Sequence, residues 1–278
     1  MKNLLLMLIG FSLFGCDKTD FPKYSLVNDL RVLALVADHP EVSPGDSVSF
    51  TPWVSDVNNT APLTYTATAC KDPGLASGQE PTCDGSSSLV SVGTGTISTL
   101  NAGNVFTGPA DSFSVSVPAD LLTGRSPISL YNGIDYLVTY TVTNASGKTV
   151  KSFKRMTVSD PSKGTKNQNP GISQLLANGA TFTTLATNGS YALGATFTPG
   201  SDETYQIQLY DGSSVTKTEE MVTTWFLSDG TLKYQRTVEA DTDTYSSPGA
   251  YPATRGSFIM AVTRDGRGGI CVQQVKIN

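Results

Sequence analysis

Apolar and polar residues alternate along most of this chain, and this alternation limits its possible folds more than any other feature. Between residues 136 and 143, large apolar side chains occupy every second position. Residues 47–51 and 112–117 follow the same two-residue period. Such a period places successive side chains on opposite faces of a β-strand. Turn sequences such as Asp211-Gly212 and Asp265-Gly266 separate the runs, so the pattern predicts an all-β protein of short strands.

A repeated unit divides the strand-forming region in two. An alternating strand, a glycine-containing turn and a second strand occupy residues 136–158 and again residues 258–277. Tyr140 and Val262 take equivalent positions in the two units, 122 residues apart, which is about the length of one β-sandwich. The repeat therefore predicts two tandem sandwiches, each closed by its own hairpin.

The first unit resembles the closing hairpin of immunoglobulin-like modules of the polycystic-kidney-disease type. The resemblance implies that Gly133 and Tyr136 form the corner at which a Tyr hydroxyl is tied to the backbone. We place immunoglobulin-like sandwiches at residues 29–160 and 170–278. The segment 161–169 between them is polar and contains Pro and Gly, as interdomain linkers do.

The N-terminus has the pattern of an export signal. Lys2 precedes an apolar run of eleven residues, Leu4 to Phe14, which is too short to cross a hydrocarbon core of about 30 Å. The sequence Leu13-Phe14-Gly15-Cys16 resembles the lipobox of bacterial lipoproteins, which implies cleavage before Cys16 and acylation of that residue. We therefore expect a signal peptide at 1–15, a tether at 16–28, and a membrane anchor of acyl chains on Cys16. An ordinary signal peptide that happens to contain Cys is the alternative.

A wider resemblance to a group of Gram-negative lipoproteins with tandem immunoglobulin-like domains supports this interpretation. The residues that carry it are Leu30 to Gly45, Asn167 to Pro170, Trp225-Phe226 with Asp229-Gly230, and Arg264 to Gly269. Cys271 stands where that group more often has an aromatic residue. The group implies the fold and a place in the bacterial envelope, at the outer membrane or the periplasmic face of the inner membrane, and it implies no activity.

Three cysteines follow Cys16. Cys70 and Cys83 enclose twelve residues, and export would allow a disulfide to form, so we expect these two to pair. Two reduced thiols, or a bond that includes Cys271, are the alternatives. Cys271 alternates with Val272 on the closing strand, where a buried and inert thiol is expected.

Charge and residue usage exclude several classes of function. The net charge of −5 and the pI near 4.9 argue against binding of nucleic acid. The only histidine, His39, precedes Pro40 in a turn, and the chain has no Gly-x-Ser-x-Gly sequence, so a hydrolase triad is not expected. Glu219 and Glu220 are adjacent, which would point them to opposite faces of a strand and suits a glycosidase pair poorly.

Two further groups of charged residues have alternative interpretations. The loop Asp241–Asp243 beside Glu239 supplies oxygen ligands for Ca²⁺, but it lacks the spacing of a calcium-binding loop, so a solvated acidic loop is expected. The hairpin tip that carries Asp265 and Arg267 is expected to serve turn geometry, with a contact patch as the alternative. We expect no metal and no cofactor.

The function predicted from these observations is non-catalytic. We expect a membrane-anchored envelope protein with a structural or protein-binding role, and its end loops 71–82 and 241–255 would meet the partner. A carbohydrate-binding or adhesion module is the alternative. That module would need exposed aromatic rings, for which the candidates are Trp53, Tyr245 and Tyr251.

Overall fold

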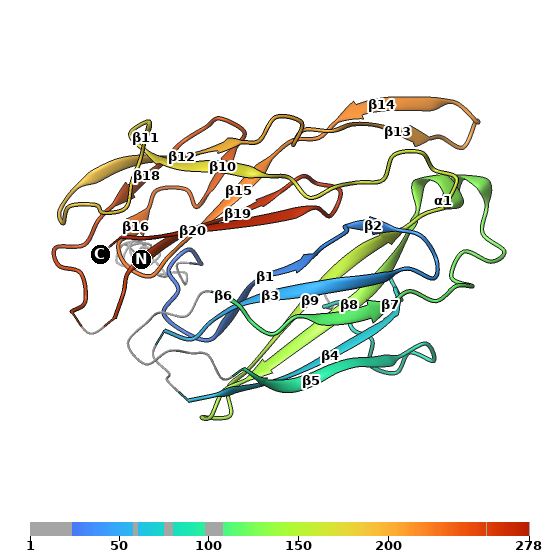
Figure 1. Cartoon of the computed structure of the whole chain (residues 1–278), viewed down its shortest axis with the longest axis horizontal. Coiled ribbons are helices and arrows are strands. Elements are labelled where there is room, and N and C mark those ends of the chain that lie inside the picture. Colours follow the sequence, from blue (N-terminus) through green and yellow to red (C-terminus); the bar gives the residue numbers. More distant parts are fainter. Residues whose placement is uncertain (1–23, 58–60, 75–79, 98–107, 254, 278) are drawn as a thin grey trace, which may run out of the picture.

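The computed structural model of the chain is almost entirely β, as predicted (Figure 1). It describes residues 24–57, 61–74, 80–97, 108–253 and 255–277, so the expected signal peptide and Cys16 lie outside the described residues. The one helix of the described chain is α1 (Pro127–Asn132), whose N-terminus is capped by the Ser126 side chain. No helix within these ranges is long and apolar enough to cross a membrane.

The first sandwich consists of two sheets that face each other. One sheet contains β1 (Arg31–Ala37), β3 (Ser47–Ser55), β6 (Gly108–Pro109) and β7 (Phe113–Ser116). The other has the order β2 (Glu41–Val42), β9 (Thr149–Val158), β8 (Ile134–Thr143), β4 (Leu63–Lys71), β5 (Val90–Ile97). Strands β3 and β4 are consecutive but lie in different sheets, and β2 pairs in parallel with β9. This crossing between antiparallel sheets, with β4 beside the closing hairpin, is the arrangement of an immunoglobulin-like sandwich.

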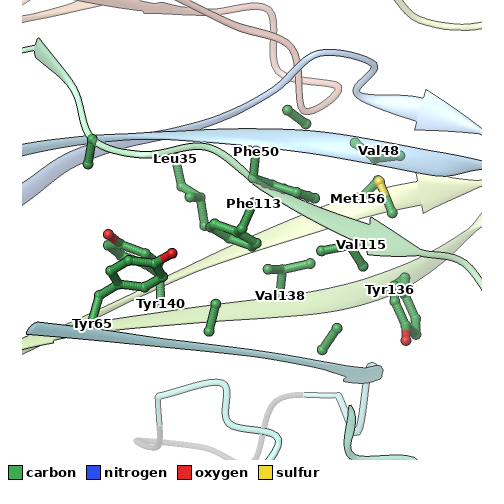
Figure 2. Packing of buried hydrophobic residues seen from close by; sticks show 14 of the residues in the cluster. Leu35, Val48, Phe50, Tyr65, Phe113, Val115, Tyr136, Val138, Tyr140 and Met156 are labelled. Carbon is green, nitrogen blue, oxygen red and sulfur yellow. The ribbon is translucent and has the colours of Figure 1, made fainter. Parts of the chain in front are cut away.

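Aromatic side chains fill the centre of this sandwich (Figure 2). The ring centroids of Phe50 and Phe113 lie 5.5 Å apart, and those of Phe113 and Tyr140 lie 5.7 Å apart. Phe50 and Phe113 are also direct partners in the β3–β7 ladder, so one sheet contributes two rings and β8 in the opposite sheet contributes the third. These contacts join the two sheets through ring stacking in addition to burial.

The second sandwich repeats this arrangement. One sheet has the order β11 (Ala180–Thr181), β10 (Ile172–Ala177), β12 (Ser190–Phe197), β18 (Asp243–Ser246), β16 (Thr231–Leu232). The other has the order β17 (Arg236–Val238), β15 (Val222–Leu227), β19 (Phe258–Arg264), β20 (Ile270–Lys276). A separate hairpin, β13 (Thr204–Gln208) and β14 (Ser214–Thr218), is inserted between β12 and β15 and lies beside α1 of the first sandwich (Figure 1).

The two closing hairpins, β8–β9 and β19–β20, form as the repeat predicted, but the residue equivalence between them is wrong. Tyr140 points into the core of the first sandwich. Val262 points away from the core of the second sandwich and belongs to a different apolar cluster. Because side chains alternate along a strand, an alignment that is wrong by one residue exchanges the two faces. Ile259 and Ala261 are the β19 residues that face the second core.

The predicted disulfide joins Cys70 and Cys83, whose Cα atoms lie 5.6 Å apart. Both cysteines are fully buried and pack with Leu137 on the outer side of the sheet. Lys151 of β9 donates to the Thr82 hydroxyl at 2.8 Å, which holds the end of the disulfide loop against the same sheet. Cys271 is free, and it is half-buried in β20 rather than fully buried as expected.

Trp225 is the largest fully buried side chain of the second sandwich, and its indole N–H donates to Thr237 at 3.0 Å. Replacing Trp225 with Ala leaves a large cavity and should lower the free energy of unfolding by about 3–5 kcal/mol. Urea unfolding followed by circular dichroism measures this loss. Tyr210 is 97% exposed, so Tyr210→Ala is the matched control and should leave the unfolding midpoint unchanged. An equal effect of the two substitutions would contradict this description of the core.

Candidate functional site

The aromatic residues expected to bind a carbohydrate are all buried or half-buried. Tyr245 is fully buried, and Tyr251 packs against the same core. Trp53 is partly buried in an apolar cluster between the two sandwiches. Tyr245 was therefore a wrong candidate, whereas Trp53 and Tyr251 are half-buried. The aromatic side chains that are most exposed among the described residues include Tyr24, Tyr210 and Tyr234.

The remaining candidates of the sequence lie in different places and do not form a common site. His39 lies at the surface beside Asp38, 3.2 Å away. The Asp243 carboxylate is buried and accepts the backbone N–H groups of Tyr234 and Gln235, so it orders its own loop. Within the described ranges, no group of three potential metal-ligating side chains occurs. Glu220 is exposed, whereas Glu219 is buried at the junction of the two sandwiches.

The two sandwiches meet at a junction that has an apolar part and a polar part. The apolar part is a contact made by the outer face of β19. Phe258, Met260 and Val262 project from the outer face of β19. They pack against Val27 and, on the first sandwich, against Leu33 and Ala34 of β1. Both faces of β19 are therefore buried, one in its own core and one in the junction.

The segment just before the first sandwich adds a backbone connection. Residues 25–27 belong to the expected tether, but they run alongside the end of β15 in the second sandwich. Val27 N–H donates to the Leu227 carbonyl at 2.7 Å, and Leu227 N–H donates to the Ser25 carbonyl at 2.8 Å. The chain thus crosses the second sandwich before it enters the first.

Arg267, at the tip of the β19–β20 hairpin, is the centre of the polar part of the junction. One guanidinium nitrogen lies 2.9 Å from Glu219 and 3.4 Å from Glu203, and another lies 3.2 Å from Glu41 of the first sandwich. The guanidinium carbon also lies 4.1 Å from the centroid of the Tyr205 ring. A planar cation with several donors suits this position, since one side chain holds three carboxylates from separate segments. The expectation that the tip serves turn geometry alone was wrong.

The segment predicted as a linker is fixed inside this network. Lys163 pairs with Glu41, and Asn167 is buried, donating its backbone N–H to Glu41 at 2.9 Å and its side-chain amide to Asp265 at 3.0 Å. Asn169 donates to the Ala37 carbonyl at 2.7 Å and accepts the Ile270 N–H at 2.9 Å, so its amide connects β1 to β20. These contacts link the two sandwiches through side chains of the connecting segment itself.

Burial changes the acid–base properties of two groups in this network. It raises the pKa of Glu219 to about 7, because desolvation and the nearby Asp265 outweigh the attraction of Arg267. It lowers the pKa of Lys154 to about 8, where the ammonium group donates to the Gly268 carbonyl of the hairpin. The junction therefore contains groups that change charge near neutral pH.

Several clefts open at the junction, among them a polar cleft and an arginine cleft. The polar cleft, with a volume of about 420 Å³, lies between α1, β9 and the inserted hairpin, and its lining includes Asp135, Arg155, Lys163, Gln206 and Arg267. The arginine cleft is larger, at about 690 Å³, and its lining includes Arg31, Arg236, Arg264, Tyr24, Tyr234 and Phe226. Neither set of lining residues contains a cysteine or a histidine. Both sandwiches therefore help to form each of these two recesses.

No protein-family model matches the chain, and no curated protein matches it. Solved structures with similar folds include the periplasmic chaperone SfaE, at 11% identity over 87% of this chain and 98% of the chaperone, with a TM-score of 0.28. The two tandem V-type regions of the chitin-binding protein VCBP3 match at 11% identity over 89% of this chain and 100% of that one, with a TM-score of 0.29.

An Escherichia coli alpha-2-macroglobulin matches at 11% identity and a TM-score of 0.28, and the match covers 91% of this chain but only 22% of the macroglobulin. The chain therefore spans about a fifth of the length of that relative. The immunoglobulin-like assignment rests on the strand order and pairing of each sandwich.

The raised pKa of Glu219 predicts a pH dependence of stability. The unfolded carboxyl titrates near 4.5 and the folded one near 7, so between these values the folded state binds more protons. Stability should therefore fall as pH rises from about 4.5 to 7, by up to roughly 1.4 kcal/mol per pH unit from this group. Urea unfolding at several pH values, compared between wild type and Glu219→Gln, isolates the contribution.

Glu219→Gln lacks the titrating carboxyl, so its free energy of unfolding should fall less between about pH 4.5 and 7 than that of the wild type. The exposed neighbour provides the control, since Glu220→Gln should keep the wild-type pH profile. An identical slope in wild type and Glu219→Gln would show that Glu219 is ionised throughout this range.

Proposed function

We propose that this chain is a non-catalytic, lipid-anchored protein of the bacterial envelope, in which two immunoglobulin-like sandwiches form one rigid binding unit. The observation that carries the proposal is the buried junction around Arg267. Its carboxylate partners come from both sandwiches, and the connecting segment is hydrogen-bonded into the same network. Such a junction supports a fixed surface on which a partner contacts both sandwiches together.

A protein partner is favoured for the polar cleft. Asn132 of α1 donates to the Gln208 carbonyl at 2.8 Å and accepts the Gln208 N–H at 2.9 Å, so the inserted hairpin is held at the rim of the cleft. The hairpin projects from the second sandwich with an exposed edge strand, β14, all of whose residues are exposed. An exposed edge and a fixed recess beside it are features through which sandwiches bind other chains.

The anchor follows from the N-terminal sequence. The lipobox resemblance at Leu13 to Cys16 supports acylation of Cys16, and the wider resemblance to Gram-negative lipoproteins supports a place at the outer membrane or the periplasmic face of the inner membrane. Several acyl chains on one residue would give stable attachment, since each buried CH₂ contributes about 0.8 kcal/mol. The polycystic-kidney-disease type of the sandwiches is part of the same proposal.

A carbohydrate-binding role is the second candidate function, and one observation favours it at the arginine cleft. Tyr24 and Tyr234, each 64% exposed, line the arginine cleft together with Phe226. Exposed aromatic rings beside hydrogen-bond donors are the combination that binds sugars. These rings differ from Trp53, Tyr245 and Tyr251, which were the candidates from the sequence.

Replacing Cys16 with Ser tests the anchor. The wild-type protein should be found in the membrane fraction with an intact mass equal to residues 16–278 plus acyl chains. Cys16→Ser should leave the membrane fraction or retain residues 1–15, because it lacks the acylated sulfur. Cys271→Ser is the control and should behave as wild type, since Cys271 is the free cysteine of β20. A mature wild-type protein without acyl mass would refute the anchor.

A photo-crosslinking residue at position 206 tests the binding role. Gln206 is exposed and lines the polar cleft, so crosslinking in intact cells should give one discrete adduct with an envelope protein. The same residue at Thr123, on an exposed turn of the first sandwich, should give none. Equal crosslinking at both positions, or none at either, would count against the polar cleft as a binding surface.

A further inference from the structure

The arginine cleft gathers positive charge in an acidic protein. Arg31 of β1, Arg236 of β17 and Arg264 of β19 all line it, and its lining residues include no Asp or Glu. Among the salt bridges of the described residues, none involves these three arginines, whereas Arg155, Arg255 and Arg267 are all paired with carboxylates. The Arg31 guanidinium donates to the Tyr24 carbonyl, and its charge helps to lower the pKa of Asp29, which pairs with Lys148. Among the residues that the structure describes, the cleft therefore holds arginines that form no salt bridge with a carboxylate.

The strand register places two of these cations on one face of the sheet, on the strands to either side of β15. Arg236 is opposite Thr224 in the β15–β17 ladder, and Arg264 is opposite Val222 in the β15–β19 ladder. Residues directly opposite in antiparallel strands share a face, and Val222 and Thr224 are two apart, so both arginines project from one face of the sheet. A guanidinium nitrogen of Arg264 lies 3.5 Å from the Thr224 hydroxyl, which holds it over the middle strand.

Without a bound anion, the position of Arg264 is electrostatically unfavourable. Burial and the charge of Arg236 both lower the pKa of Arg264, which means that the positive form of Arg264 is destabilised where it stands. An anion bound between the two guanidinium groups would reduce that repulsion and accept hydrogen bonds from their N–H groups.

The other lining residues define the rest of the ligand. Val32, Leu33 and Phe226 form an apolar part of the wall, and Tyr24 and Tyr234 contribute exposed rings with hydroxyl groups. A volume of about 690 Å³ lies within the range of small-molecule sites. The cleft thus has room for a compact anionic group and for a polyol or sugar that packs on the rings.

We propose that the arginine cleft binds a phosphate ester of a sugar or glycerol unit, either as a free molecule or as the headgroup of a membrane lipid. A phosphate monoester carries a charge near −1.5 to −2 on one compact group, which matches several guanidinium groups around a single recess. The side chains of an acidic peptide would spread single charges along an extended chain instead. This inference rests on the proposed binding function and adds its ligand class.

Binding measurements on the full-length protein in a neutral detergent test the inference. The probes are glucose 1-phosphate for a free sugar phosphate, dihexanoyl phosphatidic acid for a lipid headgroup, and glucose as the neutral control. At least one phosphate probe should bind ten-fold or more tightly than glucose, and added salt should weaken that binding. The probe that binds more tightly identifies the source of the ligand.

Substitutions in the cleft locate the site. Arg236→Gln and Arg264→Gln should each weaken binding of the phosphate probe about ten-fold or more, because each removes one guanidinium group. Arg125→Gln, at an exposed turn of the first sandwich, should leave it unchanged. Arg236 is exposed, so its substitution keeps the test available if Arg264→Gln fails to fold.

Absence of binding by both phosphate probes, or unchanged binding in Arg236→Gln, would overturn the inference. Tighter binding of a hexaglutamate peptide through the same arginines would overturn it as well, in favour of an acidic protein partner. These outcomes are separate from the anchor and the polar cleft, because neither Cys16 nor Gln206 belongs to the arginine cleft.

Discussion

The pairing of Arg267 with three carboxylates is the interaction on which the arrangement of the two sandwiches depends. Glu41 comes from the first sandwich, whereas Glu203 and Glu219 come from the segments around the inserted hairpin. Taking these charges out of water is costly, and the gain comes only if every partner is in place. Removing one partner would leave a buried charge without compensation. The network therefore acts chiefly to select one geometry of the junction, while the apolar contact of β19 supplies the favourable burial.

The two sides of the junction carry opposite charge: carboxylates gather around Arg267 on one side, and arginines gather on the other. Around Arg267, burial and the nearby Asp265 carboxylate raise the pKa of Glu219 to about 7. On the other side, Arg236 and Arg264 share a sheet face, and within the described part of the chain neither forms a salt bridge with a carboxylate. The first arrangement is compensated inside the chain, which is typical of a structural element. The second is not compensated by any carboxylate among the described residues, which is why we assign it to a ligand.

Much of the fold could be predicted from the sequence, because it depends on local patterns. Alternation gave the strands, the repeat gave two closing hairpins, and spacing gave the Cys70–Cys83 bond. The junction could not be predicted in this way. Residues 258–262 are apolar without interruption, so alternation cannot distinguish the core face of β19 from the face that meets the first sandwich. That uninterrupted run was itself a signal that both faces are buried. The polar segment 161–169 looks like a linker because composition does not reveal which polar groups find buried partners.

The central claim is that the two sandwiches behave as one unit, and calorimetry of the full-length protein tests it most directly. If the junction couples them, heat unfolding near pH 6 gives one transition whose van't Hoff enthalpy equals the calorimetric enthalpy of the whole chain. In Arg267→Gln the coupling is lost, and two transitions separate. Two separate transitions in the wild-type protein, each with the enthalpy of about one sandwich, would contradict the account.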